Sequence, residues 1–432
     1  MRCLFVVPPI YDFAAYDFWM KPYGFLQLAS FLMERGFDID FFDFTDRNHP
    51  EMHSKTGEFG KGKFLRQEVE KPEILSDVKH PFFRYGLSKE TFKNRLQSIK
   101  KPDFVFVTCA MTYWYLGILE VTEIIREKFP ETPLILGGAY VQLCEEHAQT
   151  VVKPDFIVDS EFHTLADLLK IDISREDVEN TIPAWELYEK LDYGVVKLNL
   201  GCPFRCTYCA SQVLYPVFRT RPLKTVLAEV DKLVKLGVQD IAFYDDALLV
   251  NADEILLPFL REVTKTHKNL RFQTPNAMHA RFITPEIAQA LKTYGFETIH
   301  LGFETADKKR QKETGGKVKS DEFHDAVHNL FAAGFKHKQI ITYLLVGLPG
   351  QPFEEIISGI QEVSDLGIKV MLADYSPIPH TPLFAEAQKY LNLDDPLMQN
   401  TSVFALRYFG EEKLQEIKTL KNTCNAKILR NE

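Results

Sequence analysis

The sequence has no apolar stretch that approaches the ~20 residues a helix needs to cross a bilayer. Its start, up to Pro8-Pro9, has a short apolar run and no small-residue cleavage site, so it does not resemble a signal peptide. An excess of basic residues is also missing, because the formal charge is −9. These absences argue against a membrane partner and against nonspecific binding to nucleic acid, so we expect neither as a partner.

Cysteines are few, and they are not spread in pairs. There are seven, an odd number, and three of them fall within one short segment. A secreted disulfide framework uses an even number of cysteines, so we expect a reducing, cytoplasmic compartment. A second closely spaced cysteine pair, which zinc sites favour, is absent from the sequence.

The short segment contains Cys202, Cys206 and Cys209 in a C-x3-C-x2-C spacing. It directly follows Val195 to Leu200, an apolar run that predicts a buried strand. A loop after a strand can wrap three thiolates around one inorganic centre. Three thiolates on a four-iron cluster leave one iron open to a substrate or cofactor. A three-cysteine zinc site with a distant fourth ligand is the alternative on spacing alone.

The chain is long enough for two domains, with 432 residues of ordinary globular composition. Strands and helices alternate over residues 1–171, which predicts a Rossmann-like parallel sheet. Within them, the polar stretch 45–101 is either an insertion that covers a site or a solvated excursion. Residues 172–192 are charged, contain Pro183 and lack periodicity, so we expect a linker.

Residues 193–382 repeat a strand–helix unit in which glycine closes each helix. Six strands are expected, near Val195, Ile241, Leu270, Thr298, Ile340 and Val370. Six units predict an α/β fold with a partial, TIM-like (β/α)6 barrel, whose reactive face lies at the carboxyl ends of the strands. Residues 383–432 are expected to form a helical extension.

Candidate site residues follow the ends of these strands. A buried carboxylate is costly without a partner, so carboxylates at strand ends favour a site over a plain surface position. Small residues there allow a flat ligand to approach, although a tight turn explains them equally well. The candidates are Asp245, Asp246, Asn276, Glu304, Leu345 and Gly347.

Together with Tyr208, the loop reads Cys-x3-Cys-x-Tyr-Cys and resembles the signature of the radical S-adenosylmethionine (SAM) superfamily. In that family, SAM chelates the open iron of a [4Fe-4S] cluster and is cleaved to a 5′-deoxyadenosyl radical. The resemblance implies that Tyr208 lies near the adenine. It also implies SAM contacts from Asp245 or Asp246, from Asn276 and Glu304, and from the Leu345 to Gly347 turn.

The order of motifs along nearly the whole chain resembles the class with an N-terminal cobalamin-binding-type domain. That resemblance implies cobalamin as a cofactor and methylation of an unactivated carbon. The candidate cobalamin residues end two strands of the first domain and are Thr108, Thr112, Gly137 and Gly138. The loop Pro8 to Trp19 contains no His, so this motif supplies no lower ligand for cobalt.

Two other functions remain open at this point. One is a radical SAM enzyme without cobalamin that catalyses a rearrangement, a cyclisation or an RNA modification. The other is a non-catalytic, metal-stabilised binding protein. A second cluster, as in the methylthiotransferases, is disfavoured because Cys3 and Cys144 fall inside a predicted strand and a predicted helix. The family implies a small-molecule or peptide substrate and an electron donor such as flavodoxin or ferredoxin.

Overall fold

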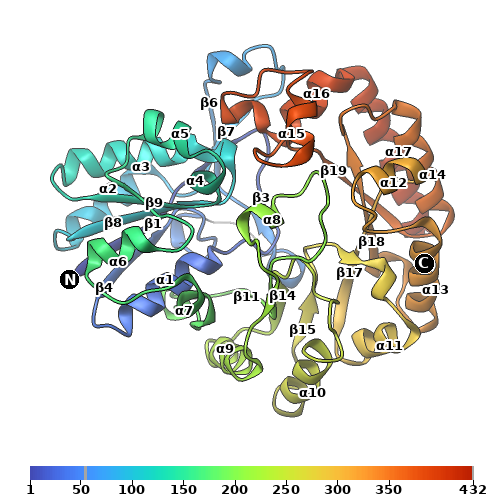
Figure 1. Ribbon diagram of the computed structural model, residues 1–432, viewed down its shortest axis with the longest axis horizontal. Helices are drawn as coiled ribbons and strands as arrows, with labels where there is room; N and C mark the ends of the chain where they lie inside the picture. Colours follow the sequence, from blue (N-terminus) through green and yellow to red (C-terminus); the bar gives the residue numbers. More distant parts are fainter. Residues whose placement is uncertain (53–55, 431–432) are drawn as a thin grey trace. The chain divides into compact units, whose positions relative to one another are not determined.

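The computed structural model describes residues 1–52 and 56–430, and it divides into two compact units (Figure 1). The first unit contains Met1–Tyr193, Asp231–Val238 and Asp394–Met398. The second unit contains Gly194–Val230, Gln239–Leu393 and Gln399–Glu432. Among the described residues, no helix combines the length and the apolar character that crossing a membrane requires.

A five-stranded parallel sheet forms the centre of the first unit. Its order is β10 (Phe156–Ile157), β9 (Leu134–Gly138), β8 (Phe104–Cys109), β1 (Arg2–Val7) and β4 (Asp38–Asp43). After β1 the chain adds β4 on one side and β8 on the other, so the winding reverses between β1 and β8. In such sheets ligands bind at the carboxyl ends of the strands at this switch point.

Helices pack on both faces of this sheet (Figure 1). On one face, α1 (Tyr23–Met33), α6 (His163–Leu169) and α7 (Arg175–Asn180) bury their apolar residues against Phe5, Phe106 and Ile135. On the other lies α3 (Tyr115–Lys128), whose buried residues recur at helical spacing, as in Ile118, Val121 and Ile125. The predicted Rossmann-like sheet is confirmed.

The described part of residues 45–101 forms secondary structure of its own. In it, β7 (Phe82–Tyr85) pairs with β6 (Arg66–Val69) and with β2 (Ile10–Asp12), which belongs to the Pro8 to Trp19 loop. Arg84 of β7 also forms a buried ion pair with Glu120 of α3 at 2.6 Å. The insertion therefore fixes that loop. The other short elements of this unit are β3 (Tyr16–Asp17), β5 (Gly62–Lys63), α2 (Lys89–Ser98), α4 (Ala139–Leu143) and α5 (Glu145–His147).

Residues 172–192, expected to be a linker, belong to the first unit. Trp185 is fully buried, and Val178 packs into the core beside α1. The Tyr188 hydroxyl donates a 2.5 Å hydrogen bond to the Asp43 carboxylate at the end of β4. A few large buried side chains anchor this stretch, and a search for periodic apolar residues does not detect them.

The second unit contains a parallel sheet whose strands follow one another in chain order. They are β11 (Gly194–Val196), β14 (Asp240–Phe243), β15 (Arg271–Gln273), β17 (Phe296–Glu304), β18 (Ile340–Val346) and β19 (Lys369–Asp374), with β16 (Met278–His279) beside β17. Helices between them are α9 (Leu223–Lys235), α10 (Leu256–Thr266), α11 (Pro285–Thr293), α12 (Lys308–Glu313), α13 (Ser320–Ala332) and α14 (Phe353–Asp365). This agrees with the predicted partial barrel of six units.

The helical extension consists of α15 (Pro382–Ala387), α16 (Thr401–Phe409) and α17 (Glu411–Arg430). Helix α17 covers the open edge of the sheet at β19. The Asn425 side chain accepts from the backbone N–H of Val370 and donates to its carbonyl, at 2.9 and 2.8 Å. One amide side chain thus satisfies backbone groups that a further strand would otherwise pair.

Candidate active site

The cysteine loop is entered through a broken strand. The run Val195 to Leu200 was predicted to be one strand, but only β11 belongs to the parallel sheet, and β12 (Asn199–Leu200) pairs antiparallel with β13 (Arg219–Thr220). The Asp245 carboxylate causes the break, because it accepts the backbone N–H groups of Leu198 and Asn199 at 3.1 and 2.6 Å. A side chain thus replaces the strand partner, and the chain turns into the loop.

Asp245 is almost fully buried, with 3% of its surface exposed. Burial raises the pKa of this carboxyl to about 7, although the two backbone hydrogen bonds and Lys197 act in the opposite direction. Its hydrogen bonds hold the chain that leads into the cysteine loop.

Asp246 holds the other end of the loop. Its carboxylate accepts a 2.6 Å hydrogen bond from the Ser211 hydroxyl, and the Ser211 backbone N–H points at Cys209 Sγ at 3.4 Å. The two adjacent aspartates therefore position the residues just before and just after the three cysteines. That both also contact SAM remains a prediction.

The three thiols lie close enough to influence one another's ionisation. Burial raises the pKa of Cys202 to about 11, and it also raises the pKa of Cys206 and Cys209. The Lys317 ammonium acts against that increase at Cys206 and Cys209. Over residues 1–52 and 56–430, no three His, Cys, Asp or Glu side chains converge on a single-ion site. The three thiolates of this loop suit a [4Fe-4S] cluster, in which each binds a different iron and the three need not meet at one point.

Glu304 and Lys317 form a buried ion pair beside these thiols, with Oε1 and Nζ 2.8 Å apart. Glu304 has a positive φ of 65° at an irregularity in the pairing of β17 with β18. A Cβ at Gly302 would lie 2.5 Å from the Glu304 carboxylate and 2.8 Å from Lys317 Nζ, so a larger residue there would displace the ion pair from this position. Although burial lowers the pKa of Lys317, Glu304 raises it above its usual value.

Tyr208 lies in the same group of side chains. Burial raises the pKa of its hydroxyl well above the usual range, and the nearby Glu304 and Cys206 add to the increase. The structure therefore brings together the predicted Tyr208, Glu304 and cysteines. Lys317 was missed because it falls in a run of charged residues, where a buried lysine looks like its exposed neighbours. The Gly315-Gly316 pair just before it was the available signal of a close approach.

Gly315 packs directly against the cysteine loop. A Cβ on it would lie 2.9 Å from the Arg205 carbonyl oxygen and 3.0 Å from the Cys206 Cα. The next link is a hydrogen bond from the Thr207 N–H to the Thr314 carbonyl at 3.2 Å. The segment after α12 is thus a second support for the loop, in addition to the two aspartates.

His279 stacks on Phe204 of the loop, with ring centroids 4.6 Å apart. It is 2% exposed, and neither ring nitrogen has a hydrogen-bond partner among the described residues. Burial lowers the pKa of His279 to about 3, with further lowering by Lys317 and Arg281. The imidazole is therefore neutral and presents a flat face to the loop.

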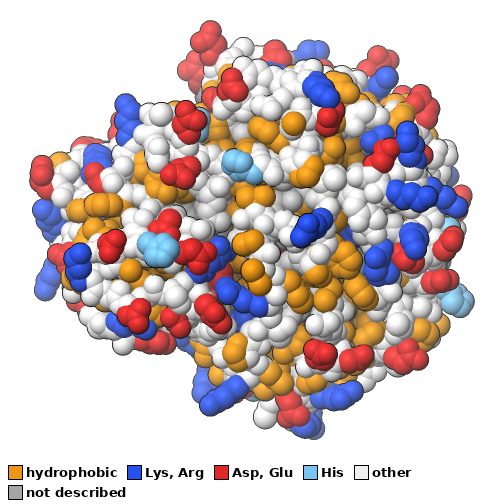
Figure 2. All heavy atoms as spheres, viewed as in Figure 1, with side chains coloured by type: hydrophobic (Ala, Val, Ile, Leu, Met, Phe, Trp, Pro, Cys, Tyr) orange, Lys and Arg blue, Asp and Glu red, His pale blue; other side chains and the backbone are white. Residues whose placement is uncertain are grey.

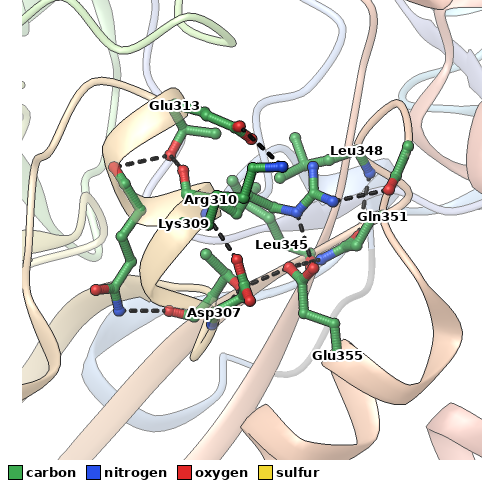
Figure 3. A network of polar contacts seen from close by, with 12 residues as sticks. Asp307, Lys309, Arg310, Glu313, Leu345, Leu348, Gln351 and Glu355 are labelled. Carbon is green, nitrogen blue, oxygen red and sulfur yellow. Dashed lines mark hydrogen bonds and ion pairs between the residues drawn. The ribbon is translucent and has the colours of Figure 1, made fainter.

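Asn276, Leu345 and Gly347 have defined local contacts. The Asn276 amide donates to the carbonyls of Tyr244 and Asp245 at 3.2 and 3.3 Å. After β18, the turn is closed by Gln351, which accepts from the Gly347 N–H and donates to the Leu345 carbonyl (Figure 3).

The same turn is held from outside by Arg310. Its side chain pairs with Glu355 at 2.9 Å and donates to the Gly350 carbonyl (Figure 3). A Cβ on Gly347 would lie 3.3 Å from Ala405 of α16. The close approach at Gly347 is therefore that of a helix, and its contact with SAM remains a prediction.

In the first unit, the glycines proposed for cobalamin face other parts of that unit. A Cβ on Gly138 would lie 2.7 Å from Thr108 Oγ1, and one on Gly137 would lie 3.4 Å from Val158. Thr112 is buried. That Thr108, Thr112, Gly137 and Gly138 contact cobalamin remains a prediction. After β8, at the switch point between β1 and β8, Met111 is 42% exposed.

Comparisons with known proteins agree with this arrangement. Residues 196–363 match the radical SAM superfamily. A Pyrococcus horikoshii protein named as a methyltransferase is 23% identical over 385 residues, which is 77% of this chain and 81% of that protein. A tRNA-2-methylthio-N(6)-dimethylallyladenosine synthase of Finegoldia magna is 23% identical over 284 residues, which is 63% of this chain and 57% of that enzyme.

Among solved structures, the radical SAM methyltransferase TsrM of Kitasatospora setae aligns with a TM-score of 0.65 and 15% identity. The alignment covers 90% of this chain and 76% of TsrM. Structures of TsrM contain tryptophan with a SAM analogue, or cobalamin with a [4Fe-4S] cluster. At this identity, the likeness shows a shared fold over both units. Residues 196–363 therefore form a radical SAM domain, and the two units of the chain share the fold of the TsrM structures.

Proposed function

We propose that this enzyme is a cobalamin-dependent methyltransferase that acts on an unactivated carbon of a small-molecule or peptide substrate. The observation that carries the proposal is the cysteine loop, with three thiols at the carboxyl end of the barrel strands and the Glu304–Lys317 pair beside them. When bound, a [4Fe-4S] cluster supplies the electron that cleaves SAM, and cobalamin supplies a carrier for the methyl group.

Cys202, Cys206 and Cys209 would hold the cluster. The methionine end of SAM carries an ammonium and a carboxylate, and the site offers one charge of each sign. Glu304 is the acceptor suited to the ammonium, and Lys317 is the donor suited to the carboxylate. Asp245 is less suited to this contact, because its carboxylate already accepts two backbone N–H groups.

Production of 5′-deoxyadenosine tests the radical SAM part of the proposal. Reconstituted protein given SAM and dithionite should release it, and Cys206→Ala should not. Glu304→Gln should keep its iron and bind SAM about tenfold or more weakly, since a charge-assisted hydrogen bond is lost. Release of equal amounts by wild type and Cys206→Ala would refute the assignment.

Cobalamin would bind over the switch point of the first unit, beside Met111. In support, the sheet reverses its winding there and the residue is exposed and apolar. Wild-type protein should keep corrin absorbance through gel filtration, and Met111→Glu should lose most of it. Val151→Glu, at another exposed apolar residue of this unit, is the matched control. A wild type that cleaves SAM but retains no corrin would rule out the cobalamin part.

Modification of tRNA is the second candidate, because a relative is named as a tRNA methylthio synthase. Such chemistry would require a second cluster, and the cysteines of the first unit are not arranged to bind one. Cys3 lies in β1, Cys109 ends β8 and Cys144 follows α4, so these cysteines come from three separate elements and not from one loop. Mass spectrometry of tRNA incubated with the enzyme and SAM distinguishes the two functions, since only the second predicts a modified nucleoside.

A further inference from the structure

A basic segment lies within this acidic chain. Residues 307–319 contain six Lys or Arg and two Asp or Glu, a formal charge of +4, whereas the whole chain has −9. Helix α12 provides most of this segment. In the space-filling view, Lys and Arg side chains gather over the region where Figure 1 places α12 (Figure 2).

Several of these charges are free to meet a partner. Lys308 and Lys312 are exposed, and among the described residues neither has an acidic partner. Lys309 and Lys319 are exposed too, and in the described part of the chain each pairs with one carboxylate, Glu313 at 3.7 Å and Glu322 at 3.6 Å. Exposed pairs of this kind are weak, so they leave these ammonium groups available.

The basic segment is also a direct support of the cysteine loop. Gly315 packs on the backbone of Arg205 and Cys206, and the Thr207 N–H bonds the Thr314 carbonyl. Arg205 itself is exposed and adds a cation between Cys202 and Cys206. At this place the loop that would hold the cluster reaches the protein surface, within a patch of positive charge.

We propose that this patch, formed by Arg205, Lys308, Lys309, Lys312 and Lys319, is the docking surface for an acidic one-electron donor protein. The inference rests on the proposed [4Fe-4S] function. In the step it serves, the reduced flavin of the donor loses one electron and the cluster gains it. Complementary charge would bring the donor to the loop quickly and in a defined orientation.

The patch suits an acidic protein better than RNA. Proteins that read single-stranded nucleic acid stack bases on aromatic side chains, and residues 307–319 contain no aromatic residue. The net negative charge of the chain would oppose a long polyanion outside this patch. The contact needed for electron transfer is small and local, which four or five cations can provide.

The test compares two reductants on one pair of variants. Lys308→Glu/Lys312→Glu reverses two charges of the patch. Lys268→Glu/Lys336→Glu makes the same change in charge at exposed lysines before β15 and β18, at the opposite ends of the barrel strands. Cluster reduction is followed by its absorbance after mixing with a purified acidic flavodoxin in its reduced form, or with dithionite.

At low ionic strength, flavodoxin should reduce the cluster of the patch variant about tenfold more slowly than that of wild type. High salt should make this difference in rate smaller. The control should behave as wild type, and dithionite should reduce all three proteins alike. Equal rates with flavodoxin would overturn the proposal. Slow reduction of the patch variant by dithionite would also overturn it, since the defect would then lie in the cluster site.

Calorimetry with oxidised flavodoxin separates this inference from the proposed function, because it needs no cluster. Weaker binding to the patch variant than to the control supports the docking surface even if no cluster assembles. Tight binding of tRNA that the same variant abolishes, with no binding of flavodoxin, would replace the protein partner by a nucleic acid.

Discussion

Asp245 decides the path of the chain into the cysteine loop. Its position after a strand could be read from the sequence, and so could the pairing with Asp246. The hydrogen-bond partners of Asp245 could not be read from the sequence, because Leu198 and Asn199 are more than forty residues away and are bound through their backbones. The sequence singled out the two aspartates for a contact with SAM, which stays a prediction, while the long-range hydrogen bonds show what they do to the loop.

Asp245 also predicts a pH dependence of stability. Its folded-state pKa of about 7 lies above the ordinary 3.8, so the protonated carboxyl is favoured in the folded protein. Its contribution is complete below about pH 4 and is lost as the pH rises towards 7. In urea unfolding without cofactors, the stability of Asp245→Asn relative to wild type should therefore increase between pH 4.5 and 7.5. Asp253→Asn, at an exposed carboxylate, should show no such trend, and a flat difference for Asp245→Asn would contradict the account.

The Glu304–Lys317 pair predicts strong coupling between its two members. Lys317→Met leaves Glu304 buried without its cation and should lower the free energy of unfolding by about 3 kcal/mol. Adding Glu304→Gln should recover much of that loss, since no uncompensated charge remains. Chemical denaturation of the two single variants and the double variant measures the coupling, and strictly additive losses would show that the pair is not coupled.

At the scale of elements, α16 and the turn after β18 support each other. The sequence predicted the turn from its glycines, but it did not show that a helix of the C-terminal extension fills the space at Gly347. The same limit applies to α17, where Asn425 pairs with the backbone of Val370 in β19. Regular elements follow from local periodicity, whereas these supports depend on which element the extension meets after folding.

Substitutions at two glycines of this turn distinguish the energetic cost of the helix contact from the cost of backbone strain. Both have positive φ, +92° at Gly347 and +71° at Gly350, but nothing lies within 4 Å of a Cβ at Gly350. Gly350→Ala should cost about 1 kcal/mol for the left-handed backbone alone. Gly347→Ala carries the same strain and also presses on Ala405, so urea unfolding should show a larger loss. Equal losses of unfolding free energy in the two variants would mean that α16 moves away from the added methyl group without an energetic cost.

At the scale of the whole molecule, the division of the chain is less simple than the sequence suggested. The segment Asp394–Met398 belongs to the first unit, although the chain on both sides of it belongs to the second. Within the first unit, the Asp395 carboxylate accepts a hydrogen bond from the Tyr115 hydroxyl at 3.2 Å. Most of the expected helical extension therefore belongs to the unit that contains the barrel, and the segment Asp394–Met398 belongs to the unit that contains the Rossmann-like sheet. The sequence predicted domains made of contiguous segments, but it did not predict that a short segment would belong to one unit while its neighbours in sequence belong to the other.

The central claim is that the three cysteines hold a [4Fe-4S] cluster with one iron left for SAM. Mössbauer spectroscopy of anaerobically reconstituted, iron-57-labelled protein tests it most directly. The account predicts about four irons per chain, one of which changes its isomer shift when SAM is added while the other three do not. Stoichiometric zinc without iron, or four irons that all ignore SAM, would contradict it.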